Sequence, residues 1–326
     1  MERHRQSGRC GVLRWIFLVL IGASSALAAG AGERLFEIAG SVEPKVEASI
    51  SIFGATEPFA EAMLADSSGH FHFARLRAGT YTLAAMAPGE GEARMTVEAG
   101  PRTADPKGRI MVTIRIPSAQ KVDLERRHSI AAPELAIPDR AWREYREAQK
   151  LLARRDAKRA REHLERSVEI APGFSEAWNN LGTIAYQAGD FERAATCFER
   201  ALAANPRAYE PLVNMGGVLI NLNRFEQARE YNQRTVLLRP NDALGNSQLG
   251  ITYFELGKDG EAEKYLRRAC ELDPAHFSHP QLVLAQIHIR QNRRAEAAAD
   301  LEEYLKVHPD APNAAELRGD IVTLRH

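Results

Sequence analysis

The sequence predicts a multidomain fold, in which a small all-β sandwich of about seven strands precedes an all-α solenoid of helical repeats. Three observations lead to this prediction. Apolar residues alternate with a period of two between residues 33 and 117. Beyond residue 139 this period is lost, and prolines recur at a constant interval instead. The chain has 326 residues, of which 44% are hydrophobic, and this length is enough for two hydrophobic cores.

Residues 1–28 have the organisation of a secretory signal peptide. Four arginines precede an apolar run, Trp15 to Ile21, and small residues then end in Ala26-Leu27-Ala28. The alternative is an uncleaved membrane anchor, but the apolar stretch barely reaches spanning length and contains Arg14. We therefore expect cleavage after Ala28 and an exported protein, periplasmic or secreted, in a bacterial envelope. A membrane would be contacted only through this segment, if it stayed uncleaved.

Residues 33–117 show strand patterns separated by turn signals. The clearest run holds Ile110, Val112 and Ile114 on one face. In the stretch GHFHF, strand alternation places His70 and His72 on one face and the two phenylalanines on the other. Two histidines are too few ligands for a zinc site. We expect the phenylalanines to enter the core and the histidines to face solvent.

One stretch of this region resembles a known family. The sequence ADSSGHFHFARLRAGTYTL, from Ala65 to Leu83, is similar to the hairpin of carboxypeptidase regulatory-like domains. In that pattern an acidic turn and a Gly-x-Phe strand are followed by Leu and then Gly-Thr-Tyr-x-Leu. The resemblance implies a β-sandwich module without an active site. Residues 118–138 follow with charged residues, Pro133 and Pro138, and no apolar period, which predicts a solvated linker.

The rest of the chain is an internal repeat. Prolines stand at positions 172, 206, 240 and 274, which are equally spaced, and another follows at 309. Gly182, Gly216 and Gly250 keep the same frame, and the best unit reads WNNLGTIAYQAGDFERAATCFERALAANP. This unit resembles the tetratricopeptide repeat, whose period is about 34 residues. We expect five such repeats over residues 139–311 and a C-terminal capping helix over 312–326. Gly182 should allow the two helices of its unit to approach, with Phe198 beside them.

The sequence contains no recognisable catalytic or metal-ligating motif. The sequence lacks H-E-x-x-H, C-x-x-C, G-x-S-x-G and Gly-rich phosphate-loop patterns. Cys197 lies inside a packed helix and is interpreted as a core thiol. The 43 basic and 43 acidic residues balance, which argues against a nucleic-acid partner. We therefore predict a protein that is not an enzyme and has no cofactor, metal or catalytic residue.

The predicted binding site is the groove formed by the first helix of each repeat. Asn180 and Asn214 are one repeat apart, and Gln248 follows in the same frame. An amide both donates and accepts, so such a ladder can pair with the backbone of an extended peptide. Alternatively, these amides are merely exposed or are bonded to a neighbouring loop. The groove is predicted to comprise Asn179, Asn180, Thr183, Val213, Asn214, Gly217, Ser247, Gln248, Ile251 and Gln286.

These observations favour an exported, non-catalytic scaffold or adaptor that binds a protein or extended peptide in the repeat groove. Two alternatives remain open at this point. In one, the sandwich is a surface- or carbohydrate-binding module and the repeats are a spacer. In the other, the chain is an accessory subunit of an envelope enzyme or secretion complex.

Overall fold

The computed structural model describes residues 34–87, 91–116 and 137–326. The predicted signal peptide and most of the predicted linker lie outside these residues. Among the described residues, none of the helices combines the length and the apolar character that crossing a membrane requires.

The N-terminal domain is a sandwich of two β-sheets, as predicted. One sheet has the strand order β4-β1-β7 and the other the order β3-β2-β5-β6. Strand β1 pairs in parallel with β7, and the other pairings are antiparallel. The strands are β1 (Phe36–Glu43), β2 (Ser49–Gly54), β3 (Ala60–Leu64), β4 (His70–Leu76), β5 (Gly79–Ala87), β6 (Gly91–Ala99) and β7 (Arg109–Arg115).

The alternation of side chains in β4 confirms the interpretation of GHFHF. Phe71 and Phe73 are buried in the sandwich core, and His70 and His72 are exposed on the outer face. His72 lies 3.5 Å from the carboxylate of Glu37, between Nε2 and Oε2. The two histidines therefore belong to the polar outer face of the sheet.

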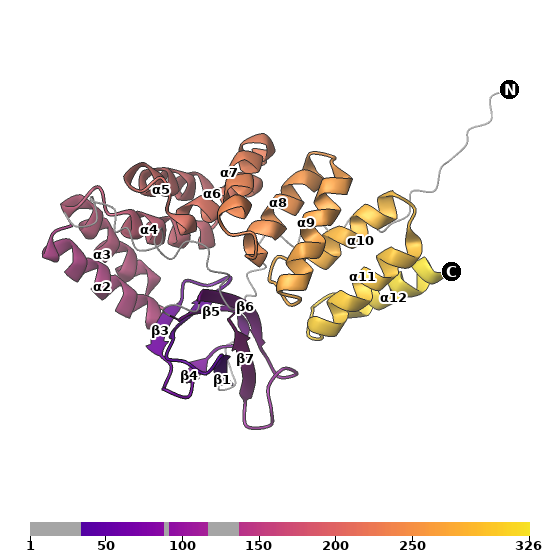
Figure 1. Ribbon diagram of the computed structural model, residues 1–326, viewed down its shortest axis with the longest axis horizontal. Coiled ribbons are helices and arrows are strands. Elements are labelled where there is room, and N and C mark those ends of the chain that lie inside the picture. Colours follow the sequence, from indigo (N-terminus) through magenta and orange to yellow (C-terminus); the bar gives the residue numbers. More distant parts are fainter. Residues whose placement is uncertain (1–33, 88–90, 117–136) are drawn as a thin grey trace.

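The C-terminal part is a stack of antiparallel helix pairs (Figure 1). Each pair forms one repeat, and α12 packs on the last pair. The helices are α2 (Asp139–Ala153), α3 (Ala157–Ile170), α4 (Ser175–Gln187), α5 (Phe191–Ala204), α6 (Tyr209–Asn221), α7 (Phe225–Leu238), α8 (Ala243–Glu255), α9 (Asp259–Leu272), α10 (Pro280–Arg290), α11 (Arg294–Val307) and α12 (Ala314–Arg325).

The recurring glycines mark the closest contacts within the repeats. A Cβ on Gly182 would lie 2.5 Å from a ring carbon of Phe198, which is only 1% exposed. The equivalent glycine of the next repeat, Gly216, faces the buried Asn232 in the same way. The partners Phe198 and Asn232 are themselves one repeat apart, so the repeat period places a small residue against the same neighbouring position each time.

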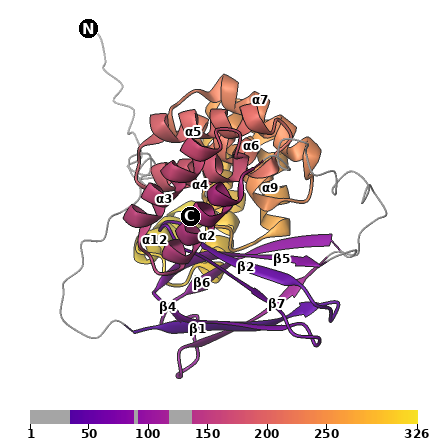
Figure 2. The same cartoon turned by 90° about the vertical axis from the view of Figure 1, so that its left-hand side faces the viewer.

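The sandwich is docked on the repeats. Figures 1 and 2 show the β3-β2-β5-β6 sheet facing the helices, with the β4-β1-β7 sheet on the far side. Strand β3 contacts α2, and hydrogen bonds join β6 and the loop after β2 to the helical part. The prediction of a linker gave no indication of this contact, because the contact joins residues that no local pattern connects.

We predict that Gly182→Ala lowers the free energy of unfolding by about 1–3 kcal/mol, because the ring of Phe198 has to move. Gly319→Ala is the matched control. Gly319 lies in α12 with no atom within 4 Å of an added Cβ, so alanine should be neutral or stabilise by up to about 1 kcal/mol. Urea unfolding of both variants tests the packing, and equal effects would contradict it.

Candidate partner-binding face of the repeats

Two of the amides predicted to line the groove, Asn180 and Asn214, form hydrogen bonds to the first helix of the preceding repeat. Asn180 Nδ2 donates to the Tyr145 hydroxyl on α2 at 3.3 Å. Asn214 Nδ2 donates to Asn179 Oδ1 on α4 at 3.0 Å. Each of these bonds spans 35 residues, so each amide reaches the first helix of the preceding repeat. The amides are half-buried, and a single hydrogen bond leaves each of them with further donor and acceptor capacity.

Gln248 and Thr183 extend this polar surface. The Gln248 amide lies over Gly217 of the preceding repeat, where an added Cβ would come within 2.7 Å of Nε2. Its Oε1 is buried, and no hydrogen bond reaches it from the described residues. Thr183 donates its hydroxyl back to the carbonyl of Asn179 at 3.1 Å. Gln286 on α10 is also half-buried.

Four of the predicted groove residues instead belong to the packing between helices. Val213, Ser247, Ile251 and Gly217 are buried. The Ser247 hydroxyl lies 2.5 Å from that of Ser278 in the following repeat. Gly217 lies under the Gln248 amide and Ser247 contacts Ser278, and all four positions are buried, so they shape the face without offering a side chain to a ligand.

Gln187 carries no motif that would mark it in the sequence, and it lies one turn beyond Thr183 at the end of α4. Its Nε2 donates to the backbone carbonyls of Gly54 and Glu57 at 3.1 and 3.2 Å. Gly54 is the last residue of β2, and Glu57 lies in the connection between β2 and β3 of the sandwich. An amide on a first helix of the repeats therefore already binds peptide backbone, within the same molecule.

Strand β6 runs along the C-terminal ends of the second helices of three repeats, whereas Gln187 lies at the C-terminal end of a first helix. The residues that end α7, α9 and α11 recur at the repeat spacing, at positions 239, 273 and 308. Each contacts one position on the outward face of β6. The three contacts are Arg239 Nη1 with Glu92 Oε1 (2.9 Å), Asp273 Oδ2 with the backbone N–H of Thr96 (2.9 Å) and His308 Nδ1 with Glu98 Oε2 (3.6 Å). One strand thus spans three successive repeat ends.

Arg94 is the centre of this interface. Its guanidinium lies 2.9 Å from Glu92, 3.0 Å from Glu210 and 3.8 Å from Asp242, in each case from nitrogen to carboxylate oxygen. Burial alone would lower the pKa of Arg94, but the three carboxylates raise it above its ordinary value. Arg94 therefore stays charged, and its charge is balanced from both domains.

Comparison with protein families identifies the helical part. Two tetratricopeptide repeat models match, one at residues 145–209, 180–243 and 282–324 and the other at 243–276. The chain belongs to the tetratricopeptide repeat (TPR) family. Both matches lie in the helices, and the identity of the sandwich as a carboxypeptidase regulatory-like domain stays a prediction. No curated protein sequence matches the chain.

Solved structures are similar to the TPR part at low identity. MamA of Desulfovibrio magneticus RS-1 is 21% identical, covers 54% of this chain and 99% of its own, and has a TM-score of 0.49. YrrB, described as a TPR protein with an unusual peptide-binding site, is 23% identical over 58% of this chain and 98% of its own, with a TM-score of 0.47. TTC0263 of Thermus thermophilus is 22% identical, covers 56% of this chain and 98% of its own, and has a TM-score of 0.44.

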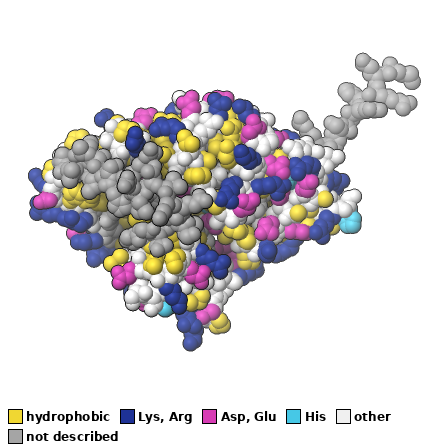
Figure 3. Space-filling model, viewed as in Figure 1, with side chains coloured by type: hydrophobic (Ala, Val, Ile, Leu, Met, Phe, Trp, Pro, Cys, Tyr) yellow, Lys and Arg dark blue, Asp and Glu magenta, His cyan; other side chains and the backbone are white. Residues whose placement is uncertain are grey.

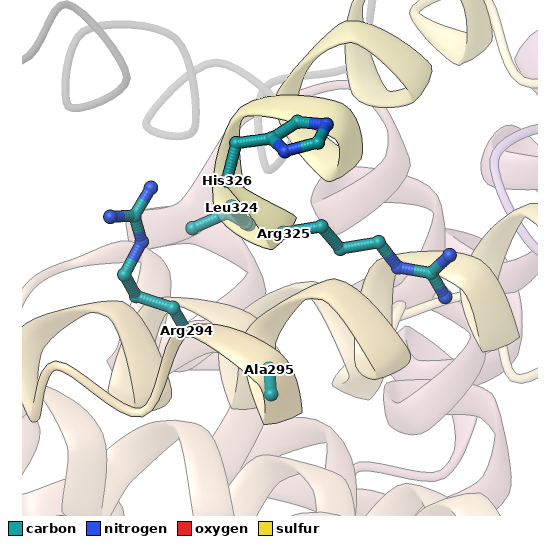
Figure 4. Close-up of a pocket in the computed structure, with 5 residues that line it drawn as sticks. All are labelled: Arg294, Ala295, Leu324, Arg325 and His326. Atoms are coloured by element: carbon teal, nitrogen blue, oxygen red, sulfur yellow. The ribbon is translucent and has the colours of Figure 1, made fainter.

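The remaining surface of the described residues carries mixed charge (Figure 3) and a shallow pocket. Figure 3 shows basic and acidic side chains interspersed over the visible face. A shallow pocket of about 450 Å³ lies between α11 and α12 (Figure 4). Two arginines that line the pocket already have partners. Arg294 donates to the carbonyl of Thr323, and Arg325 forms an ion pair with Glu302 at 2.6 Å. Figure 4 shows these two side chains pointing away from each other, so they do not converge on a ligand.

Three histidines meet where α9, α10 and α11 approach β6. His279 Nδ1 lies 3.4 Å from His308 Nε2, and His276 Nδ1 lies 2.7 Å from the Ser278 hydroxyl. Burial, followed by the nearby imidazoles, lowers the pKa of His276 to about 3 and that of His279 to about 4. Among the residues that the structure describes, no three His, Cys, Asp or Glu side chains are placed to hold a metal ion.

We predict that acid destabilises the TPR part through His276 and His279. A histidine whose pKa is lower in the folded state than its ordinary value of 6.5 takes up protons preferentially when the chain unfolds. The free energy of unfolding should therefore fall as the pH drops from about 6.5 to 4. In His279→Asn, the slope over this range should decrease by up to about 1.4 kcal/mol per pH unit, the contribution of one proton. Urea unfolding at pH 7, 6 and 5 measures the slopes, and parallel curves for the two proteins would refute the assignment.

Proposed function

We propose that this protein is an exported, non-catalytic adaptor whose TPR repeats bind an extended protein segment along the first helices. TPR proteins generally mediate protein–protein interactions as scaffolds. The observation that supports a site on α4 and α6 is the pair of half-buried, frame-matched amides of Asn180 and Asn214. Each is oriented by its bond to the preceding helix, and a side chain that is already fixed loses less entropy when it binds a ligand.

The chemistry of this surface suits a backbone ligand. An extended segment presents N–H and C=O groups at regular intervals, and an amide can pair with either. Thr183 lies one turn beyond Asn180, on the same face of α4. Together these groups would bind a segment through its main chain, with little demand on its side chains.

We place the mature chain outside the cytoplasm, on the strength of the basic, apolar and small-residue order of residues 1–28. We interpret the sandwich as a carboxypeptidase regulatory-like module, based on the resemblance of Ala65 to Leu83 and the two-sheet architecture. In this proposal the sandwich is a binding or positioning domain without a catalytic role.

The double variant Asn180→Asp, Asn214→Asp tests the amide site. The Tyr145 hydroxyl can donate to an aspartate at 180, and the Asn179 amide can turn to donate to one at 214, so the contacts between repeats are kept. The donors available to a partner are lost, and each lost bond is worth about 1 kcal/mol. We expect at least tenfold weaker binding of a short peptide selected by display on the full chain, measured by fluorescence anisotropy.

The control for this variant is Asn292→Asp. Asn292 is exposed between α10 and α11 with a positive φ of 59°, a conformation that aspartate also tolerates. It should bind the peptide as the wild type does. Unaltered affinity in the double variant would show that the amides are not the site.

Export is tested by the N-terminus of the mature protein. After expression in a bacterium with an active secretion system, mass spectrometry of the protein from the envelope fraction should give Ala29 as the first residue. Recovery of the chain with residues 1–28 still attached would contradict the proposal.

A further inference from the structure

We propose that Arg155 and Gln187 form a recognition site for an acidic, extended segment, and that the sandwich loop from Gly54 to Phe59 fills this site in the resting chain. This inference rests on the proposed function and deepens it. It assigns a chemistry to the partner and an internal competitor to the site.

The loop offers its backbone to the repeats in a fixed shape. Its two ends are joined by a hydrogen bond from the Gly54 N–H to the Phe59 carbonyl at 2.9 Å. The Ala55 N–H donates to the Thr80 carbonyl, also at 2.9 Å, which ties the loop to β5. The carbonyls of Gly54 and Glu57 both accept from the single Nε2 of Gln187. The amide recognises main chain, as the proposed function requires of a partner.

Arg155 recognises the side chains of the same loop. It lies in the turn between α2 and α3 with a positive φ of 60°, and its side chain is only 18% exposed. Nη1 is 2.9 Å from the Glu57 carboxylate, and Nη2 donates to the Tyr81 hydroxyl at 2.9 Å. The guanidinium carbon lies 4.4 Å from the centre of the Phe59 ring. A guanidinium that combines a charge-assisted hydrogen bond with an aromatic contact selects for a carboxylate next to a ring.

These two donors lie at the end of the proposed peptide site. Gln187 follows Asn180 by two helical turns and Thr183 by one, and this spacing keeps all three on one face of α4. A segment that ran along this face would arrive at the groups that now hold the loop. The loop and an external acidic segment would therefore compete, and the loop has the advantage of an effective concentration of the order of millimolar because it is in the same chain.

The loop is held in place by a second contact some distance away. Arg94 on β6 faces three carboxylates, of which Glu210 and Asp242 belong to the repeats. Reversing this charge would turn two attractions between the domains into repulsions. Such a variant weakens docking without altering Arg155, Gln187 or the amides.

The experiment compares the full-length mature wild type with Arg94→Glu. The probes are a synthetic peptide with the sequence of residues 51–60, SIFGATEPFA, and the same peptide with Gln in place of its Glu. Hydrogen exchange monitored by mass spectrometry should show faster exchange in β6 and in the loop of Arg94→Glu, which establishes undocking. We expect the acidic peptide to bind this variant at least tenfold more tightly than the wild type, and the Gln peptide to bind at least fivefold more weakly than the acidic one.

Two further variants test the same site, one by changing the sandwich loop and the other by changing the repeats. Glu57→Ala alters a loop side chain that is 57% exposed, so the sandwich should fold, and the acidic peptide should bind it more tightly than the wild type. Arg155→Ala, combined with Arg94→Glu, should abolish the preference for the acidic over the Gln peptide. Arg115→Glu is the control, because Arg115 lies on the far sheet with its side chain 82% exposed, and it should leave both docking and binding as in the wild type.

Equal affinity of wild type and undocked Arg94→Glu for the acidic peptide would overturn the inference, as would absence of binding to the undocked variant. In either case the display-selected peptide keeps the two ideas apart. If that peptide still binds through Asn180 and Asn214, the proposed function stands and only the assignment of Arg155 and Gln187 falls. If no selected peptide binds wild type or undocked protein, the proposed function itself is wrong.

Discussion

The structure depends on the close approach of the two helices in each repeat. Gly182 packs against Phe198, and Gly216 packs against Asn232 in the next repeat. The two glycines are one repeat apart, and so are the two residues that they contact. A single pair leaves an apolar face uncovered, so each repeat is stabilised by the next. This regularity also brings the residues that end α7, α9 and α11 to one side of the stack. From Glu92 to Glu98 a strand spans about 20 Å, or about 10 Å per repeat, close to the usual distance between packed helices.

The sequence predicted the repeats well because their signals are local and recur. Proline intervals and the glycine frame are visible without knowing the rotation between successive units. The contacts between successive repeats could not be predicted, because they depend on the rotation between units, which these local signals do not contain. Asn180 lies on the first helix of its repeat, as the sequence predicts, but its bond to Tyr145 depends on how far each repeat turns relative to the one before. Asn179 and Val213 occupy equivalent positions of successive repeats. Asn179 is half-buried and Val213 is buried, because α6 is covered more completely than α4.

The docking of the sandwich could not be predicted, because its contacts join residues far apart in the chain, such as Tyr81 with Arg155, 74 positions away, and Arg102 with Pro309, 207 positions away. The one available signal was the charge pattern of β6, where Glu92, Arg94 and Glu98 alternate with smaller or apolar residues. By itself such a pattern is typical of a solvated strand face. Only the structure shows that charged residues of the repeats cover this face, and that Gln187 at the end of α4 binds the Gly54 and Glu57 carbonyls elsewhere on the sandwich.

The polar nature of this interface bears on how the sandwich can act. Two apolar surfaces held together would resist separation, since opening them exposes hydrophobic area to water. Here Arg94, Arg155 and Gln187 contact carboxylates and backbone carbonyls, groups that water can solvate once the domains part. The pairs made by the exposed carboxylates of Glu57 and Glu210 contribute little net free energy each and weaken with salt. The pairs of Arg94 with the more buried Glu92 and Asp242 are screened less. Several acting together hold the sandwich in place, yet a ligand that supplies equivalent groups loses little by replacing it. An interface of this composition therefore favours a reversible occupant of the repeat face over a permanent one.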